Sequence, residues 1–206
     1  DELALTRLAI PGNFSVHNAL GAIAVGLSLG ISLADCCDAM ASAKGVKGRV
    51  EVVPTDGDYS IIIDYSHKPG ALETVLQTLR PVVKGRLVCL FGCGGDRDKV
   101  KRPIMGAIAA DNSDFVIVTS DNPRTEEPEE IIREIVAGMK NKRTPKKVIC
   151  DREEAIHWAI DNVRPGDVIL LAGKGHEDYQ VVGHEKRHMD EREIVADWLE
   201  KRKQRG

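Results

Sequence analysis

The feature that most constrains the fold is a regular alternation of apolar and amphipathic segments through residues 59–206. The apolar runs have the length of buried strands; they are SIIID (60–64), RLVCLFG (86–92), DFVIVTS (114–120), KKVIC (146–150) and DVILLAG (167–173). Between them lie segments with apolar residues at helical spacing, namely 70–83, 102–112, 127–140 and 152–163. Apolar strands separated by helices predict an α/β fold, a mostly parallel sheet with helices on both faces.

The rest of the chain divides into further parts. Residues 179–189 are typical of a hairpin that turns at Gly183, and residues 190–205 of an amphipathic closing helix. Residues 13–44 have a helical pattern, whereas residues 46–58 are rich in turn residues and poor in periodicity. We therefore expect a helical part at 1–45, a linker at 46–58 and the α/β domain at 59–206.

Composition excludes several classes of protein. The net charge of −3 over 206 residues gives no general attraction to nucleic acid or to an anionic membrane. No apolar run is long enough for a membrane span, and the N-terminal DELALTR does not read as a signal peptide. The five cysteines are odd in number and none of them has zinc-binding spacing, which favours reduced thiols. We expect a cytoplasmic protein with no nucleic-acid partner, no membrane insertion and no metal ligands in this chain.

Polar loops follow four of the five predicted strands. They are DYSHKPG (64–70), GCGGDRDK (92–99), SDNPRTEEP (120–128) and GKGHEDY (173–179). In open α/β sheets, ligands bind beyond the carboxyl ends of the strands. The sequence therefore predicts a binding site at this edge of the sheet.

The loop at 92–99 has three glycines, which suggest that its backbone approaches a ligand closely. It lacks the third glycine of a dinucleotide fingerprint, because Arg97 stands at that position, and no G-K-[ST] phosphate loop occurs in the chain. The planar guanidinium of Arg97 is suited to a carboxylate or a phosphate. A tight turn with solvated charges remains the alternative for this loop taken alone.

The next loop, SDNPR, adds a second arginine, Arg124. Asp121 and Asn122 offer side-chain oxygens, and Pro123 restricts the turn. Ordinary turn and helix-cap chemistry would explain Asp-Asn-Pro equally well. Two arginines and an acid at neighbouring strand ends nevertheless favour a binding site.

The loop GKGHED after the last strand completes the set. Gly173 and Gly175 allow close backbone approach, and His176, Glu177 and Asp178 follow them. The acids can pair with an ammonium group, just as the two arginines can pair with carboxylates. Together these groups predict an amino acid as the ligand, and a carboxylate rather than a phosphate at the glycine-rich loop.

These motifs also carry a family resemblance that covers nearly the whole chain. GNFSVHNALGAIA, GVKGRVEVV, IIIDYSHKPGALE, FGCGGDRDKVKRPIMG, VTSDNPRTEEP and LLAGKGHEDYQ occur in that order. They resemble the C-terminal part of UDP-N-acetylmuramoyl-tripeptide synthetases, the Mur ligases that add the third residue of the peptidoglycan stem peptide. The resemblance implies a three-domain enzyme, in which residues 1–45 are the tail of the central ATPase domain and residues 59–206 the Rossmann-like C-terminal domain.

The resemblance also implies ligands and roles. It implies ATP-dependent amide formation with magnesium, in which UDP-N-acetylmuramoyl-dipeptide, meso-diaminopimelate and ATP are the partners and the magnesium ligands lie in the central domain. The residues implied at the diaminopimelate site are Arg97, Asp121, Asn122, Pro123, Arg124, Gly173 and Glu177, and those implied at ATP are Asn18, Arg49 and His67. No catalytic residue is implied in this chain. Ser15, His17 and Gly70 depart from the usual family residues near the ATP contacts.

Three alternatives stay open. The first is a ligase of the same family that adds lysine; DNPR, with its terminal arginine, favours diaminopimelate because lysine has no distal carboxylate. The second is a non-catalytic Rossmann-like domain that binds a dinucleotide. The third is a metal site formed by His184 and His188 on the predicted hairpin, against which a solvated hairpin tip is the simpler interpretation.

Overall fold

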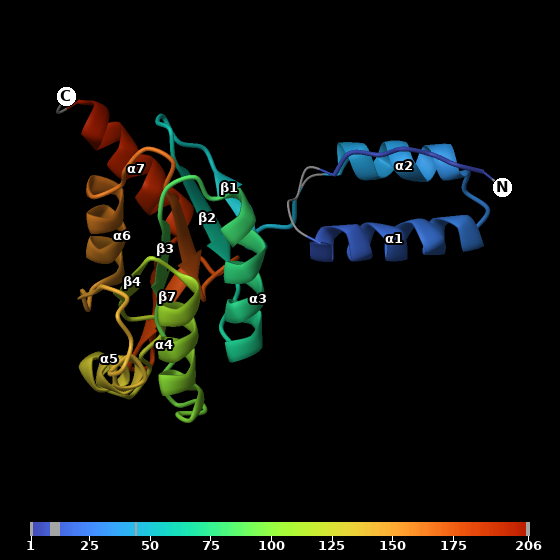
Figure 1. The fold of residues 1–206 in the computed structure, drawn as a ribbon. Coiled ribbons are helices and arrows are strands. Elements are labelled where there is room, and N and C mark those ends of the chain that lie inside the picture. Colours follow the sequence, from blue (N-terminus) through green and yellow to red (C-terminus); the bar gives the residue numbers. More distant parts are fainter. Residues whose placement is uncertain (1, 9–12, 44, 205–206) are drawn as a thin grey trace. The chain divides into compact units, whose positions relative to one another are not determined.

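The computed structural model describes residues 2–8, 13–43 and 45–204. The chain forms two compact units, Asp1–Val46 and Lys47–Gly206, which are considered separately. In the first unit, α1 (Asn13–Ser28) and α2 (Leu33–Ser42) pack together as a helical pair (Figure 1). Ser32 caps α2 by accepting a hydrogen bond from the Asp35 backbone at 3.1 Å. The predicted helical part is therefore two helices joined by a short turn.

The second unit is built on a six-stranded sheet in the order β1-β2-β6-β3-β4-β5. The strands are β1 (Glu51–Val53), β2 (Ser60–Asp64), β3 (Leu87–Phe91), β4 (Phe115–Val118), β5 (Lys146–Val148) and β6 (Val168–Ala172). β1 is antiparallel to β2, and all other pairs are parallel. This arrangement confirms the mostly parallel sheet and all five strands expected from the apolar runs.

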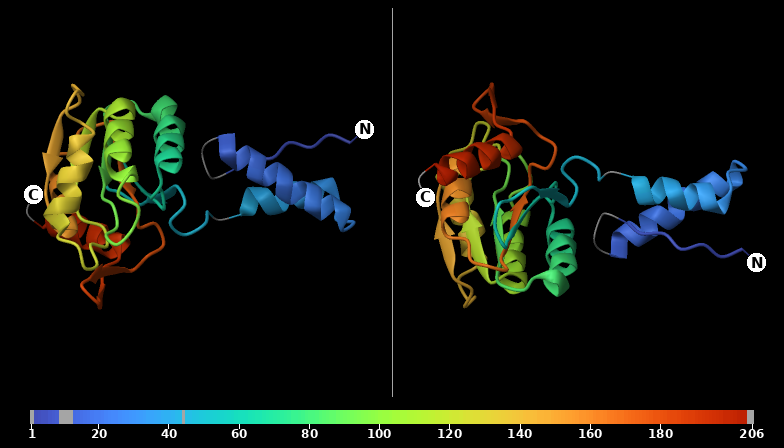
Figure 2. Two further views of the ribbon diagram at one scale, coloured as in Figure 1. Left: turned by 90° about the horizontal axis from the view of Figure 1, so that it is seen from below. Right: turned by 90° about the horizontal axis from the view of Figure 1, so that it is seen from above.

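Helices cover both faces of this sheet. α3 (Pro69–Leu79), α4 (Lys101–Asn112) and α5 (Pro128–Ala137) pack side by side on one face, and a short 3-10 helix, Arg80–Val82, follows α3. α6 (Arg152–Asp161) and α7 (Glu191–Lys203) cover the other face (Figures 1 and 2). Alternate strand residues face opposite ways, so that Ile61, Ile63 and Leu171 pack with α6 and α7 in one apolar core.

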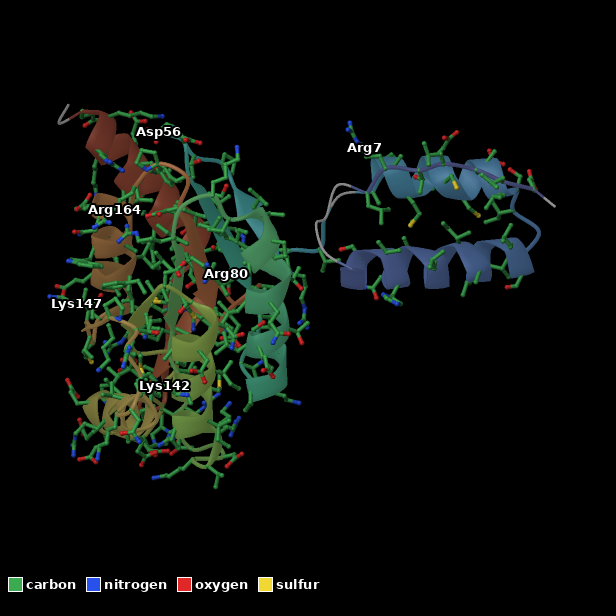
Figure 3. The ribbon with its side chains drawn as sticks, in the orientation of Figure 1. Arg7, Asp56, Arg80, Lys142, Lys147 and Arg164 are labelled. Carbon is green, nitrogen blue, oxygen red and sulfur yellow. The ribbon has the colours of Figure 1, made fainter. Side chains whose placement is uncertain are left out.

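Two features complete the unit. β7 (Tyr179–Val182) and β8 (Glu185–His188) form the hairpin predicted from the sequence, with Gly183 at a φ of 60° in the turn. Exposed charges of both signs surround the unit, with Asp56, Lys147 and Arg164 among them (Figure 3). No helix within the described ranges is long and apolar enough to cross a bilayer.

The segment 46–58, expected as a turn-rich linker with little periodicity, contains β1. Glu51 pairs with Ile63, and Val53 pairs with Ile61. A strand of three residues is too short to produce a recognisable alternation, and its pairing partner, not its own sequence, selects the extended conformation. Part of this segment therefore belongs to the sheet.

Candidate functional site

The site lies beyond the carboxyl ends of four neighbouring strands. β2, β6, β3 and β4 are parallel, so the polar loops that follow them meet at one edge. They line a cleft of about 530 Å³. Its walls include these residues predicted from the sequence: His67, Arg97, Asp121, Asn122, Arg124, Gly173 and Glu177. The polar loops that follow these strands therefore line one cleft, and that this cleft is a binding site stays a prediction.

Two glycines of the loop after β3 make room for the neighbouring loop after β4. A Cβ atom on Gly92 would lie 2.3 Å from the Thr119 carbonyl oxygen, and one on Gly95 would lie 1.9 Å from the Pro123 carbonyl oxygen. The Gly95 backbone also donates a hydrogen bond to the Asn122 carbonyl at 2.9 Å. Gly92 and Gly95 thus let the loops after β3 and β4 close on each other, while Gly92 and Gly94 also line the cleft, so that close backbone approach to a ligand stays a prediction.

Arg97 and Arg124 bring positive charge to the contact between the loops after β3 and β4. Arg97 is exposed, and its Nη1 donates to the carbonyl of Asp96 at 3.0 Å. Arg124 is half-buried, and its Nη1 donates to the carbonyl of Gly95 at 2.8 Å. Within the described residues neither guanidinium forms an ion pair with a carboxylate. Both keep donors for an anionic ligand in the cleft.

The backbone of Arg124 has an unusual conformation. Its φ is 52°, in the left-handed region that non-glycine residues seldom adopt. The Arg124 N–H donates to Val181 at 3.0 Å, and its carbonyl accepts from the Gly183 N–H at 2.7 Å. The hairpin therefore holds Arg124 in this conformation. A non-glycine residue in the left-handed region costs about 1–3 kcal/mol of stability, and such residues cluster at functional sites.

Acidic and amide groups form the opposite side of the cleft. Asn122 Nδ2 donates to Glu177 Oε2 at 2.9 Å, and Asn122 Oδ1 accepts from the Lys174 ammonium at 3.0 Å. Asp121 is buried beside them, with its Oδ1 at 4.0 Å from the same ammonium. At Gly173 the φ is 116°, and an added Cβ would lie 2.7 Å from Asp121 Oδ2. Only glycine fits between β6 and this carboxylate without strain.

Sequence reasoning missed Lys174. The side chain is completely buried although it lies in a glycine-rich polar loop. A lysine between two glycines reads as an exposed charge, and its one distinguishing signal is its position two residues after the fully apolar strand β6. Its partners, 52 residues away along the chain in the case of Asn122, cannot be inferred from local sequence.

A buried arginine on α4, Arg102, ties the glycine-rich loop to the segments after β4. Its guanidinium donates to Glu126 at 2.9 and 3.0 Å, to Glu134 at 2.8 Å and to the Gly94 carbonyl at 3.3 Å. The hydrogen bonds from Arg102 are the main reason that the pKa of Glu126 falls to about 2. This ion cluster fixes one wall of the cleft.

A second buried arginine, Arg152, supports the floor. It donates to Glu191 at 2.9 Å, to the Ala172 carbonyl at the end of β6 at 2.9 Å and to the Ser120 carbonyl at 3.3 Å. Both side chains of the Arg152–Glu191 pair are fully buried. The pair therefore connects α6 and α7 to two of the strand ends that carry the site.

The segment before β1 docks on the same edge. A Cβ on Gly48 would lie 2.1 Å from the His176 backbone nitrogen, so the two segments are in backbone contact. Glu51 accepts hydrogen bonds from Arg192 at 2.6 and 2.9 Å, which lower the pKa of its carboxyl group. Within the second unit, the segment that carries Arg49 is thus held against the strand-end loops.

The residues expected at ATP are only partly brought together. The Arg49 guanidinium lies over the ring of Tyr65, 5.1 Å from its centroid, and the same ring lies 4.6 Å from that of His67. The ring of His176 is 4.9 Å from Tyr65 on the same loop edge. Asn18 is exposed on α1 in the other unit, so the structure does not place it relative to Arg49 or His67.

Metal ligands do not cluster in the part of the chain that the structure describes. His188 binds Glu193 through Nε2 at 2.5 Å, and this contact raises the pKa of the imidazole. His184 lies exposed at the hairpin turn. The alternative of a metal site on the hairpin thus finds no cluster of three ligands among the described residues.

Comparison with known proteins shows the family to which this chain belongs. The family described as "Mur ligase, glutamate ligase domain" matches residues 48–175. A UDP-N-acetylmuramoyl-L-alanyl-D-glutamate–2,6-diaminopimelate ligase from Synechocystis is 51% identical over 190 residues, which are 91% of this chain and 37% of that protein. The enzyme of the same name from Clostridioides difficile is 46% identical over 194 residues, 94% of this chain and 40% of that protein.

A solved structure of a UDP-N-acetylmuramoyl-L-alanyl-D-glutamate–2,6-diaminopimelate ligase gives the same picture. It is 36% identical, has a TM-score of 0.75, and is matched over 96% of this chain and 40% of its own. The chain belongs to the Mur ligase family and contains its glutamate ligase domain. It spans about two fifths of the length of the relatives that it matches.

Proposed function

We propose that this chain is the amino-acid-binding, C-terminal part of a ligase that adds meso-diaminopimelate to UDP-N-acetylmuramoyl-L-alanyl-D-glutamate with ATP hydrolysis, in the synthesis of a peptidoglycan precursor in the cytoplasm. The observation that carries the proposal is the charge distribution of the strand-end cleft. Arg97 and Arg124 line it without a carboxylate partner among the described residues, and Asp121 and Glu177 line it as well. Such a cleft suits a ligand with both carboxylate and ammonium groups.

Diaminopimelate is the proposed amino acid because it has a distal carboxylate that lysine lacks. Arg124, half-buried and held by the hairpin, offers a planar pair of donors for this group. The ammonium groups of the ligand would face Asp121 and Glu177. The role of the domain is then to hold the attacking amino group in position, which by itself accelerates a two-substrate reaction greatly.

ATP and magnesium belong to the proposal at the level of the whole ligase. Arg49 and His67, which flank Tyr65, are the groups of the second unit that would reach the nucleotide, and Asn18 the group of the first. The first unit would be the tail of the central ATPase domain, which would also supply the magnesium ligands. In support, α1 exposes apolar side chains such as Leu20 and Val25, as expected for a helix that packs against more protein.

The test is an amide-formation assay on the ligase that contains this chain, with UDP-N-acetylmuramoyl-L-alanyl-D-glutamate, ATP and either meso-diaminopimelate or L-lysine. We expect product and stoichiometric ADP with diaminopimelate, and a kcat/KM for lysine lower by about 30-fold or more. Preference for lysine would identify the lysine-adding ligase instead. Turnover of neither amino acid would contradict the proposed function.

A further inference from the structure

Among the described cations of the second unit, the buried ammonium of Lys174 is the one that contacts two residues of the proposed amino-acid site, Asn122 and Glu177. Its Nζ lies 3.0 Å from Asn122 Oδ1 and 3.4 Å from Glu177 Oε2. The side chain has 0% exposure, whereas that of Glu177 has 14% and lines the cleft. Lys174 therefore contacts these two residues behind the wall of the cleft and does not itself line it.

The ammonium determines how the Asn122 amide is oriented. An ammonium group has only donors, and so has the Val181 N–H, which lies 2.9 Å from the same amide oxygen. Two donors on one side require Oδ1 there, and this turns Nδ2 toward Glu177, to which it donates at 2.9 Å. Lys174 and Asn122 thus both bind Glu177 Oε2. Among the described residues Oε1 has no hydrogen-bond donor, and it is the oxygen left for a ligand.

The cluster also has a definite charge. Asp121 and Glu177 contribute two negative charges and Lys174 one positive charge, so the group presents one net negative charge. The nearby Arg152–Glu191 pair is neutral as a whole. Burial lowers the pKa of the Lys174 ammonium, and the carboxylates of Asp121, Glu177 and Glu191 oppose this fall.

We propose that Lys174 is a positioning residue: it fixes the Glu177 carboxylate and the Asn122 amide so that this side of the cleft offers one carboxylate oxygen, from a cluster with one net negative charge, to an ammonium group of the amino acid. The proposal deepens the proposed function and rests on it. Without the buried cation, Glu177 would keep only its hydrogen bond from Asn122 Nδ2, and the carboxylates of Asp121 and Glu177 would have no cation between them. The site would then bind the same ligand with poorer geometry.

The test is a double-mutant cycle on the ligase that contains this chain, with Lys174→Met, Glu177→Gln and the two together. Lys174→Met keeps the length of the side chain and removes the charge. We expect each single variant to raise KM for diaminopimelate by about tenfold or more and to leave KM for ATP within about twofold. Because Lys174 acts through Glu177, the double variant should resemble the worse single variant instead of showing the product of both effects.

Lys186→Met is the matched control. Its Nζ lies 3.6 Å from the centroid of the Tyr179 ring, on the exposed hairpin, so the same chemical change is made near the site without touching Asn122 or Glu177. We expect KM for diaminopimelate to stay within about twofold of the wild type. Lys174→Gln, which keeps a donor but no charge, is a second variant in case Lys174→Met does not fold.

Four outcomes are decisive. An unchanged KM for diaminopimelate in Lys174→Met, or effects that multiply in the double variant, would overturn the positioning role. Loss of folding in both Lys174 variants would overturn it too, since the residue would then serve stability. If instead Glu177→Gln and Arg124→Ala both leave KM for diaminopimelate unchanged, the proposed function itself fails.

Discussion

Removal of the Arg124 guanidinium is expected to lower activity with diaminopimelate but not with lysine. The group is half-buried, and its described hydrogen bond goes to the neutral carbonyl of Gly95 at 2.8 Å. Loss of one partner of a desolvated, hydrogen-bonded charge pair costs about 2–5 kcal/mol. Partial exposure favours the lower end, and about 2 kcal/mol corresponds to roughly 30-fold in kcat/KM. Arg124→Ala should therefore lower kcat/KM for diaminopimelate by about 30-fold, while the poor turnover of lysine should hardly change.

The Arg124→Ala substitution should leave the backbone strain at this position nearly unchanged. Arg124 has a φ of 52°, and alanine and lysine pay a similar cost for this conformation. Arg124→Lys keeps the charge without the planar pair of donors, so it should restore activity only in part. Arg133→Ala, on the exposed side of α5, removes an arginine paired with Glu130 and serves as the control, with unchanged kinetics expected.

The assay is steady-state amide formation by the whole ligase at saturating ATP, with both amino acids and each variant. The decisive quantity is the ratio of the two kcat/KM values, because a general loss of folded enzyme cancels from it. If diaminopimelate and lysine lose activity equally in Arg124→Ala, Arg124 has a structural role and the diaminopimelate assignment is refuted.

Two further predictions concern stability. Gly95→Ala places a Cβ against the Pro123 carbonyl, and it should lower the free energy of unfolding, measured by urea titration, by about 1–3 kcal/mol. The control Gly70→Ala, whose Cβ would have nothing within 4 Å, should be neutral or slightly stabilising. Equal effects of the two substitutions would argue against the loop contact. Because Arg102 lowers the pKa of Glu126 from 4.5 to about 2, this pair stabilises the fold above pH 4.5 and its contribution is lost as the pH falls toward 2. The stability difference between the wild type and Glu126→Gln should therefore shrink over that range, and a difference independent of pH would contradict the ion pair.

The sequence predicted the parallel strands and the hairpin because their signals are local. Runs such as 87–91 and 168–172 are apolar throughout, which only a strand buried on both faces requires, and Gly183 marks a tight turn. β1 escaped prediction because its three residues pair at the sheet edge through a partner about ten residues further along the chain.

The sequence predicted that the polar loops meet at one edge of the sheet, but not the contacts within the cleft that they line. The rule that ligands bind beyond the carboxyl ends of parallel strands placed Arg97 and Arg124 together correctly. The sequence around the buried cations Arg102 and Arg152 does not distinguish them from surface charges, and Lys174 is marked only by its position two residues after β6. Only the tertiary partners, from distant parts of the chain, reveal them.

A crystal structure of the ligase with bound meso-diaminopimelate tests most directly whether the strand-end cleft holds the amino acid through its carboxylates. We predict a carboxylate oxygen of the ligand within about 3.2 Å of the Arg124 guanidinium, and an ammonium group on the side of Glu177. A ligand bound outside this cleft, or one whose ammonium group faces Arg124, would contradict the account.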